Sequence, residues 1–183
     1  LNLNVEYLFF QDSIDPGYNP ILWSSVSGGV ASGICGSATG NALYFNSAGS
    51  RFAATASVNV LNGGTVYFSL KIANGIAPCD AAETGEDVVL EYSINGGASW
   101  TIFQTYNENA YPNFTSLSAA IPAAAKTTAS RFRWRQLSNS GAGQDNWALD
   151  NIFIGTINNS IYPFTWTPVT DLSDEGIPNP VAT

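Results

Sequence analysis

The sequence predicts an all-β fold, an antiparallel β-sandwich of the jelly-roll type, and three observations lead to this prediction. Apolar and polar residues alternate over short segments, which is the period of a half-buried strand. Clusters of glycine and asparagine separate these segments, as turns do. No segment repeats its apolar residues at the helical period. About nine short strands joined by such turns are typical of a sandwich or a jelly roll.

The clearest strand is expected over residues 65–72, where Val66, Phe68, Leu70 and Ile72 fall on one face. The polar residues between them fall on the other face, so one side of this strand should be buried. The remaining strands are expected at residues 7–10, 42–45, 53–60, 88–93, 100–105, 116–121, 131–136 and 147–154.

Turn residues predict how some of these strands connect. Asn95-Gly96-Gly97 lies between two apolar segments and predicts a hairpin, and Asn62-Gly63-Gly64 predicts a second one earlier in the chain. The alanine-rich segment 119–125 is interrupted by Pro122, which favours a strand followed by a loop.

The composition changes near Gly155, and this change predicts a domain boundary. Residues 1–156 are expected to form one domain with its own core. Residues 157–183 are expected to be a linker followed by a truncated next repeat or an extended tail, because so short a segment cannot form a core.

The charge balance bears on possible partners. Six Lys and Arg residues stand against 14 Asp and Glu residues, which gives a net charge of −8. Nucleic acid is an unsuitable partner because its phosphates are neutralised by Lys and Arg, and an anionic membrane surface is disfavoured for the same reason. No apolar stretch is long enough for membrane insertion. A cation such as Ca²⁺ suits this balance better.

The chain contains no histidine, which removes most catalytic arrangements. No Ser-His-Asp triad and no Cys-His pair can form, and the commonest zinc ligand is missing. A carboxylate pair for glycoside hydrolysis, such as Asp145 with Asp150 or Glu91, is the remaining option. Because carboxylates at strand ends are more often structural, we expect no enzymatic activity.

Cys35 and Cys79 are the two cysteines. A composition poor in charged residues favours an oxidising compartment, so we expect one disulfide. Two buried free thiols are the alternative.

An ordered series of motifs resembles a subrepeat of reelin, a jelly-roll module of a large extracellular matrix glycoprotein. The resemblance covers roughly residues 7–155. It rests on Cys35-Gly36, residues 42–46 (ALYFN), 49–51 (GSR) and 66–72 (VYFSLKI), Cys79, residues 86–93 (EDVVLEYS) and 95–97 (NGG), Trp100, residues 131–136 (RFRWRQ) and 147–152 (WALDNI). The family implies a disulfide at the matching cysteines, a bound Ca²⁺ and no catalysis. The chain departs from reelin in having no Cys-rich, EGF-like segment, so receptor signalling is not carried over.

Calcium ligands are expected where the first and last strands of a jelly roll lie side by side. Asp12 follows the segment YLFF and Asp150 lies in WALDNI, and the resemblance places acidic residues at both positions. Gln11 stands where the family often has Glu. Asp145 and Asn151 are further candidate ligands. Alternatively, Asp12 caps a turn and Asp150 accepts hydrogen bonds from backbone amides.

Three other features suggest possible binding sites. The acidic residues 80–87 after Cys79 either bind a cation or form a solvated loop. Arg131, Arg133 and Arg135 form a row on one strand face, which suits an acidic sugar or a partner carboxylate, or else pairs across strands with Glu91. Aromatic residues in expected loops, namely Trp23, Tyr106 and Tyr111, either stack on sugars or cover the core.

The C-terminal residues resemble a different family from the rest of the chain. Residues 166–182 are similar to the opening strand of Ig-like or PKD-like repeats, as in bacterial surface adhesins exported by the type IX secretion system. Together the features predict a non-catalytic, extracellular adhesion or structural module of a multi-domain cell-surface protein or filament. Its partners would be neighbouring domains of the same polypeptide, surface glycans or other surface proteins. The alternative is a carbohydrate-binding module of a secreted enzyme.

Overall fold

The computed structural model describes residues 10–156, which form a two-layered β-sandwich. The predicted jelly-roll class is confirmed. These residues form eleven strands and one short 3₁₀ helix: β1 Phe10–Asp12, β2 Trp23–Ser27, β3 Gly29–Ser32, β4 Ala42–Phe45, β5 Phe52–Thr55, β6 Thr65–Ile72, β7 Val88–Ser93, β8 Thr101–Tyr106, β9 Thr115–Ala120, η1 Ala123–Ala125, β10 Arg131–Gln136 and β11 Trp147–Gly155.

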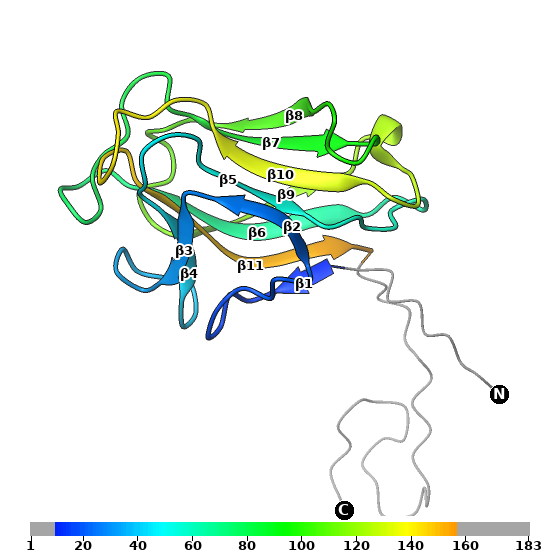
Figure 1. Ribbon diagram of the computed structural model, residues 1–183, viewed down its shortest axis with the longest axis horizontal. Helices are drawn as coiled ribbons and strands as arrows, with labels where there is room; N and C mark the ends of the chain where they lie inside the picture. Colours follow the sequence, from blue (N-terminus) through cyan, green and yellow to red (C-terminus); the bar gives the residue numbers. More distant parts are fainter. Residues whose placement is uncertain (1–9, 157–183) are drawn as a thin grey trace, which may run out of the picture.

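The two sheets are antiparallel throughout. Strands β3-β4-β11-β6-β9 form one sheet, to which β1 adds by pairing with β11. Strands β2-β5-β10-β7-β8 form the other. Figure 1 shows the five-stranded sheet, with β7, β8 and β10, above the six-stranded sheet, with β6, β11 and β1.

The core fills the space between the sheets and follows the predicted alternation. Val66, Phe68, Leu70 and Ile72 of β6 are each 2% exposed or less. Trp134 of β10 meets Phe68 across the layers, with ring centroids 5.3 Å apart at a steep angle. Such edge-to-face aromatic contacts add to the free energy gained by burying the rings.

Strand β11 organises the six-stranded sheet because it pairs with β1, β4 and β6. The expectation that the first and last strands lie side by side is therefore confirmed for the described residues. The pairing of β11 with β6 shifts register between Asp150 and Phe153, where Asn151 has a φ of +48°. This bulge turns the side chains at 150 and 151 away from the regular ladder.

Some details differ from the expectation. The turn at Asn95-Gly96-Gly97 closes a β7–β8 hairpin as predicted. The turn at 62–64 closes no hairpin, because β5 and β6 lie in different sheets and the chain crosses between the layers there. The predicted strand at 53–60 ends at Thr55 and continues only as an isolated bridge at Val58.

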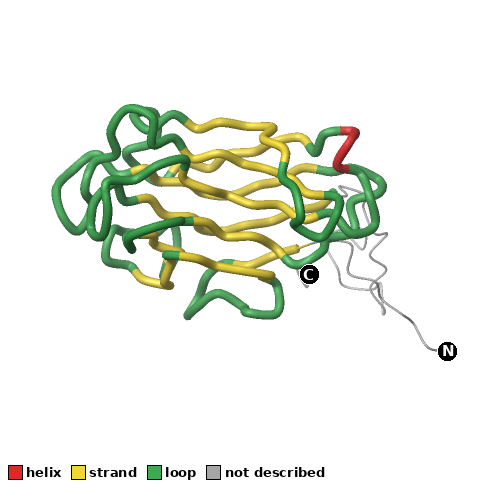
Figure 2. The backbone as a smooth tube through the Cα atoms, turned by 45° about the horizontal axis from the view of Figure 1, so that its top comes forward, coloured by secondary structure: helices red, strands yellow, loops and turns green. Residues whose placement is uncertain are grey.

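Loops collect at the two ends of the strands (Figure 2). One end carries the long loops 73–87 and 137–146, seen on the left of Figure 1, and these two loops are joined by hydrogen bonds. Among residues 10–156 there is no helix long and apolar enough to cross a membrane. The predicted linker and further repeat at 157–183 lie outside the described residues.

Candidate functional site

The outer face of the five-stranded sheet carries the three arginines of β10. Glu91 of β7 stands opposite Arg133 in register and is only 3% exposed. Arg133 donates from Nε to Glu91 Oε2 at 2.7 Å, and Arg135 donates from Nη2 to Oε1 at 2.8 Å. The predicted cross-strand pairing with Glu91 is confirmed for these two arginines. Arg131 makes only a long contact, 3.5 Å, from Nε to Ser57 Oγ.

Aromatic rings hold the middle guanidinium in place. The guanidinium carbon of Arg133 lies 4.3 Å from the ring centroid of Trp100 and 5.6 Å from that of Phe52. One face of the Trp100 ring is therefore covered by a cation and is not available to stack on a sugar. The arginine row is a preorganised cationic surface more than an aromatic platform.

The pKa shifts of Glu91 and Arg135 agree with a charged pair on this face. Burial alone would raise the pKa of Glu91, but the hydrogen bonds and charges of Arg135 and Arg133 together outweigh it and hold that pKa below its ordinary value. The hydrogen bond to Glu91 raises the pKa of Arg135. Glu91 and Arg135 are therefore both charged at neutral pH.

Arg135 also lines a hollow beside the sheet. This open hollow of about 420 Å³ is formed by Gly49, Ser50, Arg135 and residues 136–141. Its lining is mostly polar side chains and backbone, so a ligand there would be bound through hydrogen bonds and charge.

The aromatic residues expected in loops contribute to the core instead, and only Tyr111 lies in a loop, because Trp23 begins β2 and Tyr106 ends β8. Trp23 and Tyr106 are each 6% exposed and belong to the main core cluster. Tyr111 packs against Tyr106 with ring centroids 5.7 Å apart. The expectation that these residues cover the core is confirmed.

Asp12, at the end of β1, accepts hydrogen bonds from neighbouring groups. Its carboxylate accepts hydrogen bonds from the backbone amides of Ile14 and Asn19 and from the Trp23 indole, at 3.0, 2.9 and 2.6 Å. A carboxylate offers about four lone-pair positions, so these three donors leave about one for a metal. The geometry is that of the turn-capping alternative.

Asp150 and Asn151 project from the bulge of β11 toward the loop that follows Cys35. Asp150 accepts hydrogen bonds from the amides of Ala38, Thr39 and Asn151, at 2.8, 3.0 and 2.7 Å. Burial raises the pKa of Asp150, and these amide bonds act against that rise. Thr39 Oγ1 donates to Asn151 Oδ1 at 3.0 Å.

Asp15 is a member of this region that sequence reasoning missed. Its charge contributes to the raised pKa of Asp150, and it accepts a hydrogen bond from the amide of Asn41 at 2.7 Å. A Cβ on Gly40 would lie 1.8 Å from Asp15 Oδ2, so the glycine is needed for this approach. The only signal in the sequence was an acidic residue in a Pro-Gly turn, which is too common to single out.

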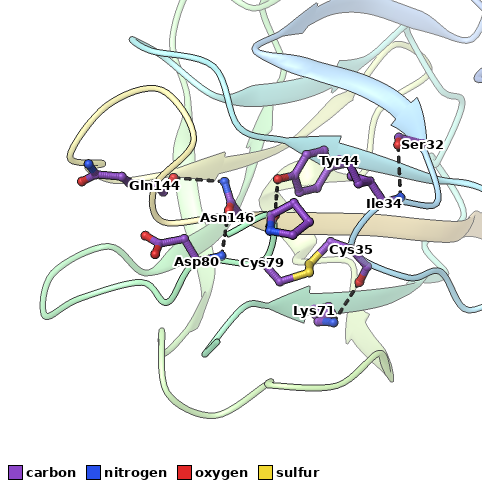
Figure 3. The surroundings of a disulfide bond; sticks show 10 residues. Ser32, Ile34, Cys35, Tyr44, Lys71, Cys79, Asp80, Gln144 and Asn146 are labelled. Carbon is purple, nitrogen blue, oxygen red and sulfur yellow. Dashed lines mark hydrogen bonds between the residues drawn. A yellow bond between two sulfur atoms is a disulfide. The ribbon is translucent and has the colours of Figure 1, made fainter. Parts of the chain in front are cut away.

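The expected disulfide between Cys35 and Cys79 is present and anchors the adjoining loops (Figure 3). Lys71 Nζ donates to the carbonyl of Cys35 at 2.8 Å, and the Tyr44 hydroxyl donates to the carbonyl of Pro78. Just beyond Cys79, the amide of Asp80 donates to Asn146 Oδ1 at 2.9 Å. The disulfide therefore ties one end of the acidic loop to the loop at Cys35, and the hydrogen bond to Asn146 ties it to the segment before β11.

Asp145 belongs to that acidic region and not to the one around Asp150. It precedes β11, and five residues of extended strand span roughly 16 Å. Oxygens of Asp145, Glu83 and Glu86 lie within 4.8 Å of one another. The structure thus divides the four candidate metal ligands: Asp150 and Asn151 lie together, Asp12 caps its own turn on the neighbouring strand, and Asp145 joins a different cluster.

Arg51 lies beneath this acidic cluster and has no exposed surface. Its guanidinium donates to the carbonyls of residues 47, 141, 144 and 145 and to Gln136 Oε1. Burial lowers the pKa of Arg51, and the charges of Asp145 and Glu86 oppose that shift. The sequence showed Arg51 as part of a motif but gave no sign that it would be buried.

Comparison with known structures places this geometry among β-sandwich domains. The K1 cleaved adhesin domain of Lys-gingipain from Porphyromonas gingivalis W83 matches with a TM-score of 0.60 and 16% identity, over 81% of this chain and 98% of that one. A family 29 carbohydrate-binding module variant complexed with mannohexaose matches with a TM-score of 0.51 and 14% identity, over 81% and 91% of the two chains. Another variant of that module matches at 0.52 and 11% identity, over 81% and 89%.

At such low identity these structures share the fold. The sequence itself matches the family model for reelin subrepeat B over residues 28–155, which is most of the chain and includes both cysteines and strands β3–β11. The predicted resemblance is thereby confirmed, and the chain belongs to the reelin subrepeat B family.

Proposed function

We propose that this chain is a non-catalytic adhesion module of a larger extracellular or cell-surface protein, and that the arginine face of β10 binds its partner. The observation that carries the proposal is the fixed guanidinium row. Arg133 and Arg135 are held by the buried Glu91, while Arg131 has one long contact. A preorganised row of this kind loses little side-chain entropy on binding.

The ligand chemistry follows from the donors. Arginine recognises planar anions through paired N–H donors, so the partner would present carboxylates, either acidic sugars or acidic side chains. The hollow beside Arg135 adds backbone and hydroxyl groups on the same side of the molecule. The chain has a net charge of −8, so this row of positive charges differs from the rest of the molecule. It would therefore orient an acidic partner toward this face.

The adhesin and carbohydrate-binding domains that share this fold support a binding role over a catalytic one. The absence of histidine agrees with it. A carbohydrate-binding module for neutral glycans is the second candidate, favoured by the fold shared with the mannohexaose complex. Against it, Trp100 is covered by Arg133, and Trp23 and Tyr106 are built into the core.

Binding to an array of acidic and neutral glycans, and to acidic peptides, tests the proposal. Arg131→Gln removes the guanidinium that Glu91 does not hold, and should weaken binding to carboxylate ligands about tenfold. Lys126→Gln removes the same charge at an exposed site near η1 and serves as the matched control. Binding of neutral glycans that Arg131→Gln leaves unchanged would instead establish the carbohydrate-binding alternative.

We also propose that Ca²⁺ stabilises the module at the β1–β11 edge, with Asp12, Asp150 and Asn151 as ligands. The family implies an ion, Asp12 and Asp150 lie on paired strands, and the charge of Asp15 acts on Asp150, so hard oxygens are present along this edge. An ion there would stiffen the start and end of the domain and so set its angle to neighbouring domains. The proposal predicts that Asp150→Asn lowers the number of Ca²⁺ ions bound.

A further inference from the structure

A second group of carboxylates lies on two loops before β7 and β11, next to the hollow that Arg135 lines. Glu83 and Glu86 come from the loop between Cys79 and β7, and Asp145 from the loop between β10 and β11. One oxygen of each lies within 4.8 Å of the others. Glu86 is 5% exposed and Asp145 is fully buried, so two of the three are withdrawn from water.

The donors around the cluster do not satisfy its oxygens. The amide of Ser140 donates to Asp145 Oδ2, and the amide of Glu83 donates to Glu86 Oε2 at 2.6 Å. The Ser140 hydroxyl is shared at long range, 3.4 and 3.3 Å, between Glu83 and Glu86. Asp145 Oδ1 is buried and has no hydrogen-bond partner among residues 10–156. Buried polar atoms nearly always have one, so this oxygen points to a missing ligand.

No protein cation within residues 10–156 forms an ion pair with the cluster. Within residues 10–156 the ion pairs shorter than 4.0 Å are those of Glu91 with Arg133 and Arg135. Arg51 lies beneath the cluster, but its donors are taken by carbonyls and by Gln136. Three carboxylates this close repel one another strongly in a partly buried site. Either a shared proton or a bound cation must lie between them.

We propose that Glu83, Glu86 and Asp145 bind a Ca²⁺ ion, in a site separate from the β1–β11 edge. Three carboxylates supply three to six hard oxygens, and Ca²⁺ takes six to eight in flexible geometry. The Ser140 hydroxyl contacts both glutamates and is placed to add another oxygen. Zinc is disfavoured because the cluster has neither imidazole nor thiolate. Loop-borne ligands also suit Ca²⁺ better than the strict octahedron of Mg²⁺.

Such an ion would add a further link between two loops that are already joined by hydrogen bonds. The acidic loop is tied on one side to the disulfide at Cys79 (Figure 3), and its Asp80 accepts a hydrogen bond from the amide of Asp145 at 3.2 Å. Ser140 and Gly141 line the hollow beside Arg135. Calcium would therefore fix the wall of that hollow, whether or not the arginine face binds a partner.

Asp145→Asn is the variant that tests the site. Asparagine tolerates the φ of +52° at this position, and its amide oxygen can still accept from the Ser140 amide. Its amide group can donate to the glutamates, so the metal-free variant should melt no lower than the metal-free parent. In the parent chain, excess Ca²⁺ should raise the melting temperature by roughly 5 to 10 °C.

Calcium titration of chelator-treated protein by calorimetry gives the second readout, and Asp150→Asn is the matched control. We expect Asp145→Asn to remove one binding event and its share of the melting shift, and Asp150→Asn to leave that event in place. If Asp145→Asn should misfold, Glu86→Gln tests the same event. A parent chain that binds no Ca²⁺, an unchanged titration in Asp145→Asn, or an equal shift with Mg²⁺ would overturn the assignment.

Discussion

Two carboxylate sites in this molecule, one on a strand and one on loops, have pKa values shifted in opposite directions. Glu91 lies on the five-stranded sheet between two arginines, and its pKa is held below the ordinary value. Glu83 and Glu86 lie in a loop beside Asp145, and the pKa of each is raised, for Glu83 mainly by the adjacent carboxyl group of Asp145 and for Glu86 mainly by burial. The charge of Glu91 is neutralised by two arginines of the neighbouring strand. The charges of the carboxylate cluster can be neutralised only by a proton or by an ion bound from solution.

The difference lies in the kind of backbone that presents each group. Antiparallel strands set Arg133 directly opposite Glu91, so compensation is built into the register. The acidic loops converge because the disulfide and Asn146 hold them there, without a cation on either loop within reach. A paired site contributes to the rigidity of the sheet, whereas an unpaired one makes loop geometry depend on what the solution supplies.

The largest expected effect comes from removing the anchor of the acidic loop. The disulfide spans 44 residues, and Cys35→Ala with Cys79→Ala should lower the free energy of unfolding by about 4 kcal/mol on the loop-entropy model. Urea denaturation of the double variant measures this loss.

In the double cysteine variant, calcium affinity should fall as well, because the loop that carries Glu83 and Glu86 is no longer held at Cys79. Binding to the arginine face should be unchanged in protein that is still folded. A double variant with parental calcium affinity would show that the disulfide does not position the acidic cluster.

Glu91→Gln should have the next largest effect. It keeps the shape of the side chain but leaves Arg133 and Arg135 side by side without an anion. Removing one partner of a buried pair costs about 3 to 5 kcal/mol, and because these arginines are 17% and 28% exposed we expect about 2 kcal/mol. Thermal melting measures it. Arg131→Gln, on the same face but outside the pair, should change stability by less than about 0.5 kcal/mol.

The same pair sets a pH dependence of known sign. The pKa of Glu91 in the folded chain lies below its ordinary value of 4.5, so its charge stabilises the fold fully above pH 4.5. That contribution declines as the pH falls below 4.5 toward the folded pKa. The parent and Glu91→Gln should therefore converge in stability at low pH, and a constant gap between them would contradict the pairing.

The sheet side of this comparison was predictable from sequence, because the two-residue period of a strand fixes which face each side chain occupies. Arg131, Arg133 and Arg135 had to share a face, and Phe132 and Trp134 had to point into the core. Strands β2 and β3 were not foreseen, since WSSVS and GVAS do not alternate clearly. The turn at 62–64 was visible, but a turn does not reveal which sheet receives the next strand.

The loop side was harder to predict. Residues 80–87 were noted as acidic, and Asp145 was named as a metal ligand, but it was grouped with Asp12 and Asp150. Its partners come from a loop about 60 residues earlier, and no local pattern encodes that contact. The calcium ligands expected at Asp12 and Asp150 stay a prediction, since both carboxylates accept three hydrogen bonds from neighbouring donors.

The smallest expected effect concerns the aromatic cover of the arginine row. Trp100→Leu removes the ring 4.3 Å from the Arg133 guanidinium and keeps an apolar side chain in place. A cation–π contact at a partly exposed site contributes about 0.5 to 1 kcal/mol. A double-mutant cycle of Trp100→Leu with Arg133→Gln, followed by urea denaturation, should return a coupling of that size. A coupling near zero would mean that Glu91 alone positions Arg133, and that the aromatic residues contribute to this face only by covering it.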